Sequence, residues 1–201
     1  LKALGAMTSQ GEVTNIGRAM ERFPVESSYA RMLIEGEKYS KEVQAKLAAI
    51  IGIKEVGGII KGGNRFTGWR KLTRQTKSDL LAQYDIYLKS ADILPDEFED
   101  MGIIAKNIIK AKEVIERLHR DLGLLDIELS PVSSKEEAPL LKSIVAGQID
   151  QLWAMNDRGR VEHIFTGKER ELSSSSVVRN PLLVCGTPFD LEVPTHRGDL
   201  E

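Results

Sequence analysis

The sequence predicts an α+β, multidomain protein in which a mainly helical first two-thirds is followed by a β-rich tail. Up to Gly147, apolar residues recur every three or four positions between helix-capping and helix-ending residues, a spacing typical of amphipathic helices. After Gly147 the period becomes two, as in Val161, His163 and Phe165, which is typical of half-buried strands.

The expected helices begin at polar residues that cap a helix N-terminus: Thr14 or Asn15, Ser27 or Ser28, Ser40, and Ser78. Pro95 opens a further helical stretch with acidic residues in its first turn, which suits the helix dipole. The longest helix is expected over 103–122, before Gly123. A loop containing two prolines then leads to a last helix over 140–146.

In the tail, Asp157-Arg158-Gly159 predicts a hairpin turn. Strands are expected at 161–165, 177–178, 182–185 and 189–193. The chain therefore divides into four parts: a small helical module (1–60), a Gly-rich basic connection (61–77), a helical bundle (78–147) and a β domain (148–201).

Composition limits the function. The net charge of −2 and the pI of about 6.0 argue against a uniformly basic nucleic-acid binder but leave room for local basic patches. The single cysteine, Cys185, rules out an intramolecular disulfide, fits a reducing compartment and is expected to be a buried thiol. No apolar run approaches the ~20 residues that span a bilayer, and no signal peptide is seen. We therefore expect a cytoplasmic protein without a membrane partner, and the start at Leu1 suggests a piece of a longer chain.

No catalytic residue, cofactor site or metal site is expected. A phosphate-binding loop needs Gly-Lys followed by Ser or Thr, whereas Gly167-Lys168 precedes Glu169. The three histidines, His119, His163 and His196, are far apart and lack cysteine partners at zinc-ligand spacing.

The positive signal is electrostatic. Residues 61–77 interleave Phe66 and Trp69 with six cations and no acidic residue, a mixture that stacks bases and neutralises phosphates. Arg65, Trp69 and Arg70 are its candidate nucleic-acid contacts, and a solvated surface loop is an equally good interpretation. On the 103–122 helix, the five cations accompany three acidic residues at pairing distance along the helix, so the helix alone favours a solvated face. A serine run at 173–176 lies near Arg170 and Arg179.

Five segments in order resemble the C-terminal half of DEAH-box ATP-dependent RNA helicases. They are Leu4-Gly-Ala6 with Gly11 to Thr14, Ile16 to Met20 and Ala30 to Leu33; Ser78 to Leu81 with Tyr84 to Tyr87; Ala105-Lys106 to Leu118; Leu140 to Gln148; and Glu171 to Val177 with Pro181 to Val184. The resemblance covers nearly the whole chain, with gaps around 53–77 and 124–138. Ser173 and Ser174 depart from the His-Pro often found there.

The resemblance implies a degenerate winged helix, a helicase-associated (ratchet) bundle and an oligonucleotide-binding (OB) domain, which the short β tail leaves incomplete. It implies that these parts guide single-stranded RNA while the parent's two RecA-like domains hydrolyse ATP with Mg. Lys106, Lys110 and Arg117 would face the strand, together with Arg170, Ser175 and Ser176. The implied partners are single-stranded RNA, the RecA-like domains and a regulatory protein.

Two other functions stay open. One is a non-enzymatic protein-interaction module built from winged-helix and OB-like domains. The other is a winged-helix regulator of duplex DNA, although the segment 16–22 offers only Arg18 and Arg22 against Glu21. A stand-alone enzyme is the least favoured.

Overall fold

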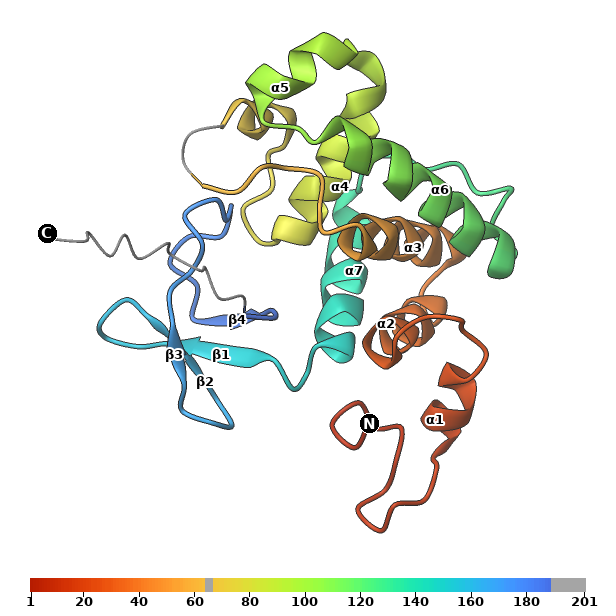
Figure 1. Cartoon of the computed structure of the whole chain (residues 1–201). Coiled ribbons are helices and arrows are strands. Elements are labelled where there is room, and N and C mark those ends of the chain that lie inside the picture. The colour runs from red at the N-terminus through yellow and green to blue at the C-terminus, as the bar shows by residue number, and fades with distance from the viewer. Residues whose placement is uncertain (64–66, 189–201) are drawn as a thin grey trace, which may run out of the picture.

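The computed structural model describes residues 1–63 and 67–188 and confirms an α+β protein (Figure 1). The helices are α1 (Asn15–Met20), α2 (Ser27–Glu37), α3 (Lys41–Glu55), α4 (Asp79–Lys89), α5 (Phe98–Met101), α6 (Ala105–Asp121) and α7 (Ser134–Gly147), with 3-10 turns η1 (Gly68–Leu72), η2 (Ser90–Asp92) and η3 (Pro95–Glu97). The strands are β1 (Leu152–Met155), β2 (Val161–His163), β3 (Glu169–Arg170) and β4 (Leu183–Cys185).

For three of the predicted helix starts, the structure contains the capping hydrogen bond. The hydroxyl of Thr14 accepts from the Gly17 amide at 3.1 Å, and Ser40 and Ser78 do the same for α3 and α4. Such a side-chain oxygen satisfies an amide that the helix itself leaves without a partner. The expected cap at Ser27 or Ser28 is wrong, because both serines are already helical and Glu26 precedes them without a side-chain capping bond.

The last helix begins six residues earlier than predicted. Pro139 was expected in the loop, but it lies inside α7. The helix starts directly after Ser133, because the Glu136 carboxylate accepts from the Ser133 amide at 2.9 Å and from the Ser133 hydroxyl at 2.7 Å. The Ser-x-x-Glu signal was present in the sequence and outweighs the single amide that the proline lacks.

One apolar core joins most of the helices. Leu33 of α2, Leu47 of α3, Tyr84 of α4, Leu118 of α6 and Leu140 of α7 are each at most 1% exposed and belong to the same cluster. This core crosses the predicted boundary between residues 1–60 and 78–147, so the packing does not separate these two modules. A smaller cluster holds the N-terminal segment against α1 and α2.

Small residues bring the helices close together. A Cβ atom at Gly147 would lie 2.4 Å from the backbone oxygen of Ser28, at the contact of α7 with α2. A Cβ atom at Gly52 would lie 2.7 Å from the side chain of Ile115, where α3 meets α6. Any larger side chain at these positions would push the helices apart.

The β part is a four-stranded antiparallel sheet in the order β3-β2-β1-β4. Trp153 in β1 is opposite His163 on one side and Val184 on the other. The predicted turn at 157–159 is confirmed, because the Asn156 amide donates to the Arg160 carbonyl at 2.8 Å and Gly159 has a φ of +74°.

The strand predictions have mixed outcomes. The strand at 182–185 is confirmed as β4, and 161–165 contains β2. The strand at 177–178 is wrong, because the Val177 amide donates to the Asp79 side chain instead of to a neighbouring strand. The strand expected at 189–193 lies outside the described residues.

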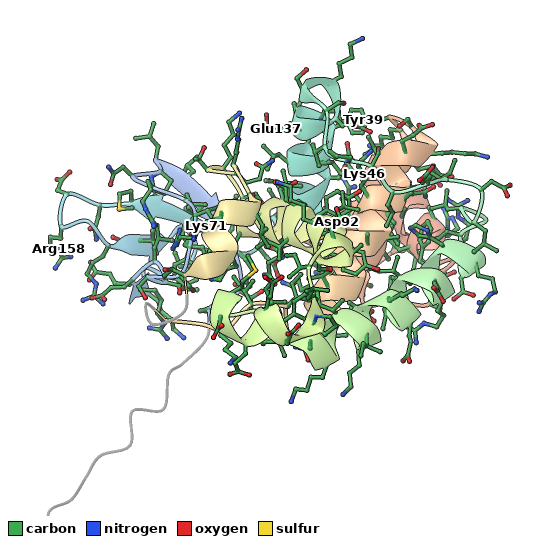
Figure 2. The ribbon with its side chains drawn as sticks, turned by 90° about the horizontal axis from the view of Figure 1, so that it is seen from above. Tyr39, Lys46, Lys71, Asp92, Glu137 and Arg158 are labelled. Carbon is green, nitrogen blue, oxygen red and sulfur yellow. The ribbon has the colours of Figure 1, made fainter. Side chains whose placement is uncertain are left out.

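The sheet lies at one end of the molecule, beside the helices. Figure 2 shows Arg158 at the outer end of the sheet, and Lys46 on the helical side. Val177 is part of the main core, and Cys185 is partly buried against it. These two residues join the tail to the helical part.

Candidate nucleic-acid interface

Helix α6 presents a continuous solvent-facing surface. Its buried side chains Ala111, Ile115 and Leu118 recur every three or four residues and pack into the main core. The opposite face is exposed. It carries four of the helix's five cations, Lys106, Lys110, Arg117 and Arg120, and one carboxylate, Glu113, between Lys110 and Arg117. Ile109, which is 63% exposed, lies on the same face.

The expected ion pairs along α6 are not formed. Within the described residues, no carboxylate lies within 4.0 Å of the charged groups of Lys106, Lys110, Lys112 or Arg120. Arg117 instead pairs with Glu55 of α3 at 3.3 Å. Helix α6 has five cations and three carboxylates, an excess of two cations. Four cations are therefore available to neutralise an external anion, whereas Arg117 is partly neutralised already.

The second candidate region is the serine turn, which we define as residues 173–176. The Ser176 amide donates to the Ser173 carbonyl at 3.0 Å, which closes the turn. The Ser173 and Ser175 hydroxyls lie 2.8 Å apart and hydrogen-bond to each other. The turn follows β3 and precedes the two valines that enter the core.

Two residues about a hundred positions earlier in the chain hold the serine turn. The Asp79 carboxylate accepts from the Ser176 hydroxyl at 2.7 Å and from the Val177 amide at 2.6 Å. The Arg70 guanidinium donates to the carbonyls of Ser174, Ser175 and Ser176 at 3.2–3.3 Å. We call Asp79 and Arg70 together the clasp. It connects the start of α4 and the turn η1 to the β part.

The clasp changes the roles expected of the serines and of Arg170. Ser176 is 4% exposed, so its hydroxyl is committed to Asp79 and is not presented to a ligand. Arg170 is half-buried and donates to the Glu169 carbonyl at 3.1 Å. Ser174, which was not among the predicted contacts, is exposed, and its amide and hydroxyl make no hydrogen bond to the described residues.

Arg179 is the other exposed group at the serine turn. Its guanidinium donates to the Ser176 carbonyl at 2.7 Å, an oxygen that Arg70 also contacts at 3.3 Å. Among the described residues, neither guanidinium has a carboxylate within 4.0 Å. The two guanidiniums and the Asp79 carboxylate together leave the turn with an excess of one positive charge, two cations against one anion, which makes it weakly electropositive.

Residues 61–77 were interpreted either as a base-stacking nucleic-acid contact or as a solvated surface loop, and neither interpretation describes Trp69. Trp69 is 1% exposed and lies in the main core, so its ring is not available to stack on a base in this structure. Arg70 lies over that ring at 4.6 Å and points to the serine turn. Arg65 and Phe66 lie outside the described residues. The expectation of a flexible surface segment is therefore wrong for η1.

Among the predicted contacts, the structure brings Arg70 next to Ser175 and Ser176 of the serine turn. The serine turn and α6 lie apart. In Figure 1, α6 lies on one side of α4, and the segment between β3 and β4 lies on the other. A ligand that contacts both regions has to cross the molecule.

Features typical of metal sites and of membrane spans are absent from the described residues. Within residues 1–63 and 67–188, no three His, Cys, Asp or Glu side chains are grouped so that they could hold a metal ion. His119 and His163 bond to the backbone carbonyls of Ala45 and Asp150 at 3.0 and 2.9 Å, and His196 lies outside the described residues. In the same part of the chain, no helix combines the length and the apolar character needed to span a membrane.

A search of protein-family models finds no match to the chain.

An apolar groove of about 620 Å³ lies between the N-terminal segment, α2 and α7. Its lining includes Leu4, Tyr39, Val145 and Ile149. Arg31 and Glu35, whose side chains are paired at 2.8 Å, also line it. This groove lies outside both electropositive regions.

Proposed function

We propose that this chain is an accessory region that binds single-stranded RNA through the exposed face of α6. The observation that carries the proposal is the set of unpaired cations on α6. Lys106, Lys110 and Arg120 lie on the exposed face of the helix, and no described carboxylate lies within 4.0 Å of their charged groups. Binding of this kind is electrostatic and independent of sequence, and a small excess of charge predicts weak binding.

In this proposal the chain belongs to a larger protein that resembles a DEAH-box RNA helicase. In that proposal, α1 to α3 with the Met7–Val13 bridge correspond to the winged helix, and α6 to the long helix of the ratchet domain. The four-stranded antiparallel sheet corresponds to part of the OB domain. Hydrolysis of ATP with Mg, and hence unwinding, would belong to RecA-like domains of the parent protein.

Binding to labelled oligo-U and to duplex DNA of the same length tests the proposal. A single strand should bind with an affinity that falls as salt rises, because each phosphate contact releases counterions. Duplex DNA should bind no better than the single strand, since α1 has only Arg18 as a cation. Preferential duplex binding would favour the winged-helix regulator instead, and no binding at low salt would remove the RNA function of this chain.

A protein-interaction module is the second candidate function, and the groove between α2 and α7 is the observation that favours it. Val145, which is 36% exposed, is a suitable probe because it lines the groove and lies away from α6. Under the RNA proposal, Val145→Lys leaves the oligo-U affinity within about twofold of the unmodified chain. A loss of binding to the parent's RecA-like domains in this variant would instead show that the groove is a protein interface.

A further inference from the structure

The clasp connects segments that are distant in the chain but meet at one electropositive turn. Asp79 uses both carboxylate oxygens, one for the Ser176 hydroxyl and one for the Val177 amide. Arg70 contacts three successive carbonyls. The clasp therefore contacts Ser174, Ser175 and Ser176 within the turn and Val177 directly after it, and the three Arg70 contacts share the two hydrogens of one nitrogen. These bonds hold the turn in one conformation and so orient its exposed groups.

The groups that the clasp leaves exposed have the chemistry of a phosphate contact. Ser174 offers an amide and a hydroxyl without described partners, and Arg179 offers a guanidinium without a described carboxylate. Phosphate oxygens prefer this combination of hydroxyl, backbone N–H and guanidinium donors. Asp79 forms no ion pair with Arg179 within 4.0 Å, and its two oxygens accept from the Ser176 hydroxyl and the Val177 amide.

We propose that Asp79 and Arg70 are positioning residues, which hold the serine turn so that Ser174 and Arg179 contact a phosphate group of the nucleic acid. This inference rests on the proposed function and adds a second contact region to α6. It assigns direct contact to Ser174 and Arg179. Ser176, whose hydroxyl is committed to Asp79, acts only through the turn.

Two substitutions at Asp79 separate positioning from charge. Asp79→Ala and Asp79→Asn both remove the negative charge, so any electrostatic effect on RNA is the same in both. Asn, however, can restore the geometry: its amide oxygen can accept from the Val177 amide, and its NH₂ group can donate to the Ser176 hydroxyl oxygen. If Asp79 acts by positioning the turn, Asp79→Asn should therefore retain RNA affinity. If Asp79 acts through its charge, Asp79→Asn should behave like Asp79→Ala.

The readouts are the oligo-U affinity at low salt and the hydrogen exchange of the Val177 amide. We expect Asp79→Ala to bind about tenfold more weakly than Asp79→Asn and to exchange the Val177 amide faster. Ser174→Ala should weaken binding similarly, and adding it to Asp79→Ala should cost little more, because both act on one contact. Ser176→Ala, which removes one of the two bonds to Asp79, serves as a milder variant if Asp79→Ala does not fold.

Three results would overturn the inference. Affinities of Asp79→Ala and Asp79→Asn that equal each other but differ from that of the unmodified chain would show that only the charge matters. Unchanged binding of Asp79→Ala, with faster exchange at Val177, would show that the clasp is structural only; in both cases the proposed function of α6 stands. Absence of oligo-U binding by the unmodified chain would remove the proposed function, and this inference with it.

Discussion

Lys46 and Glu136 form a buried ion pair between α3 and the start of α7. The Lys46 side chain is 3% exposed, and its ammonium donates to the Glu136 carboxylate at 2.6 Å and to the Ser130 hydroxyl at 3.2 Å. The same carboxylate accepts from Ser133 and so caps α7. One carboxylate thereby supports both a helix start and a contact between two helices that are far apart in the chain.

Removing only one partner of this pair should destabilise the fold strongly. Lys46→Ala leaves the Glu136 carboxylate partly buried without its cation, and such a loss typically costs about 3–5 kcal/mol of unfolding free energy. Urea unfolding of the variant measures this cost. Lys41→Ala changes an exposed lysine of the same helix and should shift the unfolding free energy by less than about 0.5 kcal/mol. Equal effects of the two substitutions would contradict the role assigned to the ion pair.

The pair also predicts a dependence of stability on pH. Burial alone would raise the pKa of Glu136, but the hydrogen bonds from Lys46 and Ser133 outweigh it and hold the pKa below its ordinary value. Since the folded pKa is the lower one, this contribution to stability is complete above about pH 5 and is lost as the pH falls through the folded value. Thermal unfolding between about pH 6 and pH 3 should show a shallower loss in Lys46→Met than in the unmodified chain. Identical pH profiles would contradict the assignment.

Gly147→Ala should be destabilising although alanine is the better helix former. The helix preference favours the variant by about 1 kcal/mol, but the new Cβ would lie 2.4 Å from both Ser28 and Met32. Overpacking of this kind typically costs about 1–3 kcal/mol, so we expect a net loss of stability on urea unfolding. Gly186→Ala is the matched control, because its Cβ would meet no atom within 4 Å. A more stable Gly147→Ala would show that α2 and α7 can separate at no cost.

The thiol of Cys185 should react slowly in the folded protein. Burial raises its pKa, and the nearby Lys54 ammonium offsets this only in part. Since the thiolate is the reactive form, alkylation by iodoacetamide at about pH 8 should be slower in the native chain than in the chain unfolded in urea. A native rate equal to the unfolded rate would show that the thiol is neither buried nor shifted.

Local signals predicted much of the fold. Thr14, Ser40 and Ser78 each place a hydroxyl before an apolar stripe, and each caps a helix because that bond needs no tertiary partner. The buried stripe of α6 followed from its spacing in the same way. The start of α7 differs from the prediction because the bonds between Ser133 and Glu136 begin the helix ahead of Pro139.

The candidate site was harder to predict because its contacts are long-range. Nothing local to Asp79 indicates that it bonds to residues nearly a hundred positions later. Trp69 lies in a polar, glycine-rich segment but is buried, since η1 packs onto the helical core. Spacing along α6 predicted ion pairs with its own acidic residues, whereas Arg117 pairs with Glu55 on α3. Tertiary packing decided each of these cases.

The salt dependence of oligo-U binding in a Lys106→Ala/Lys110→Ala variant tests the central claim most directly. Each phosphate contact to a single strand contributes roughly −0.7 to the slope of log K against log salt, so the double variant should have a slope shallower by about 1.4 and a weaker affinity at low salt. Lys135→Ala, at an exposed position near the start of α7, is the control and should leave both unchanged; Figure 2 shows α7 and α6 on opposite sides of the molecule. A slope that is the same in the double variant, the control and the unmodified chain would contradict RNA binding by α6.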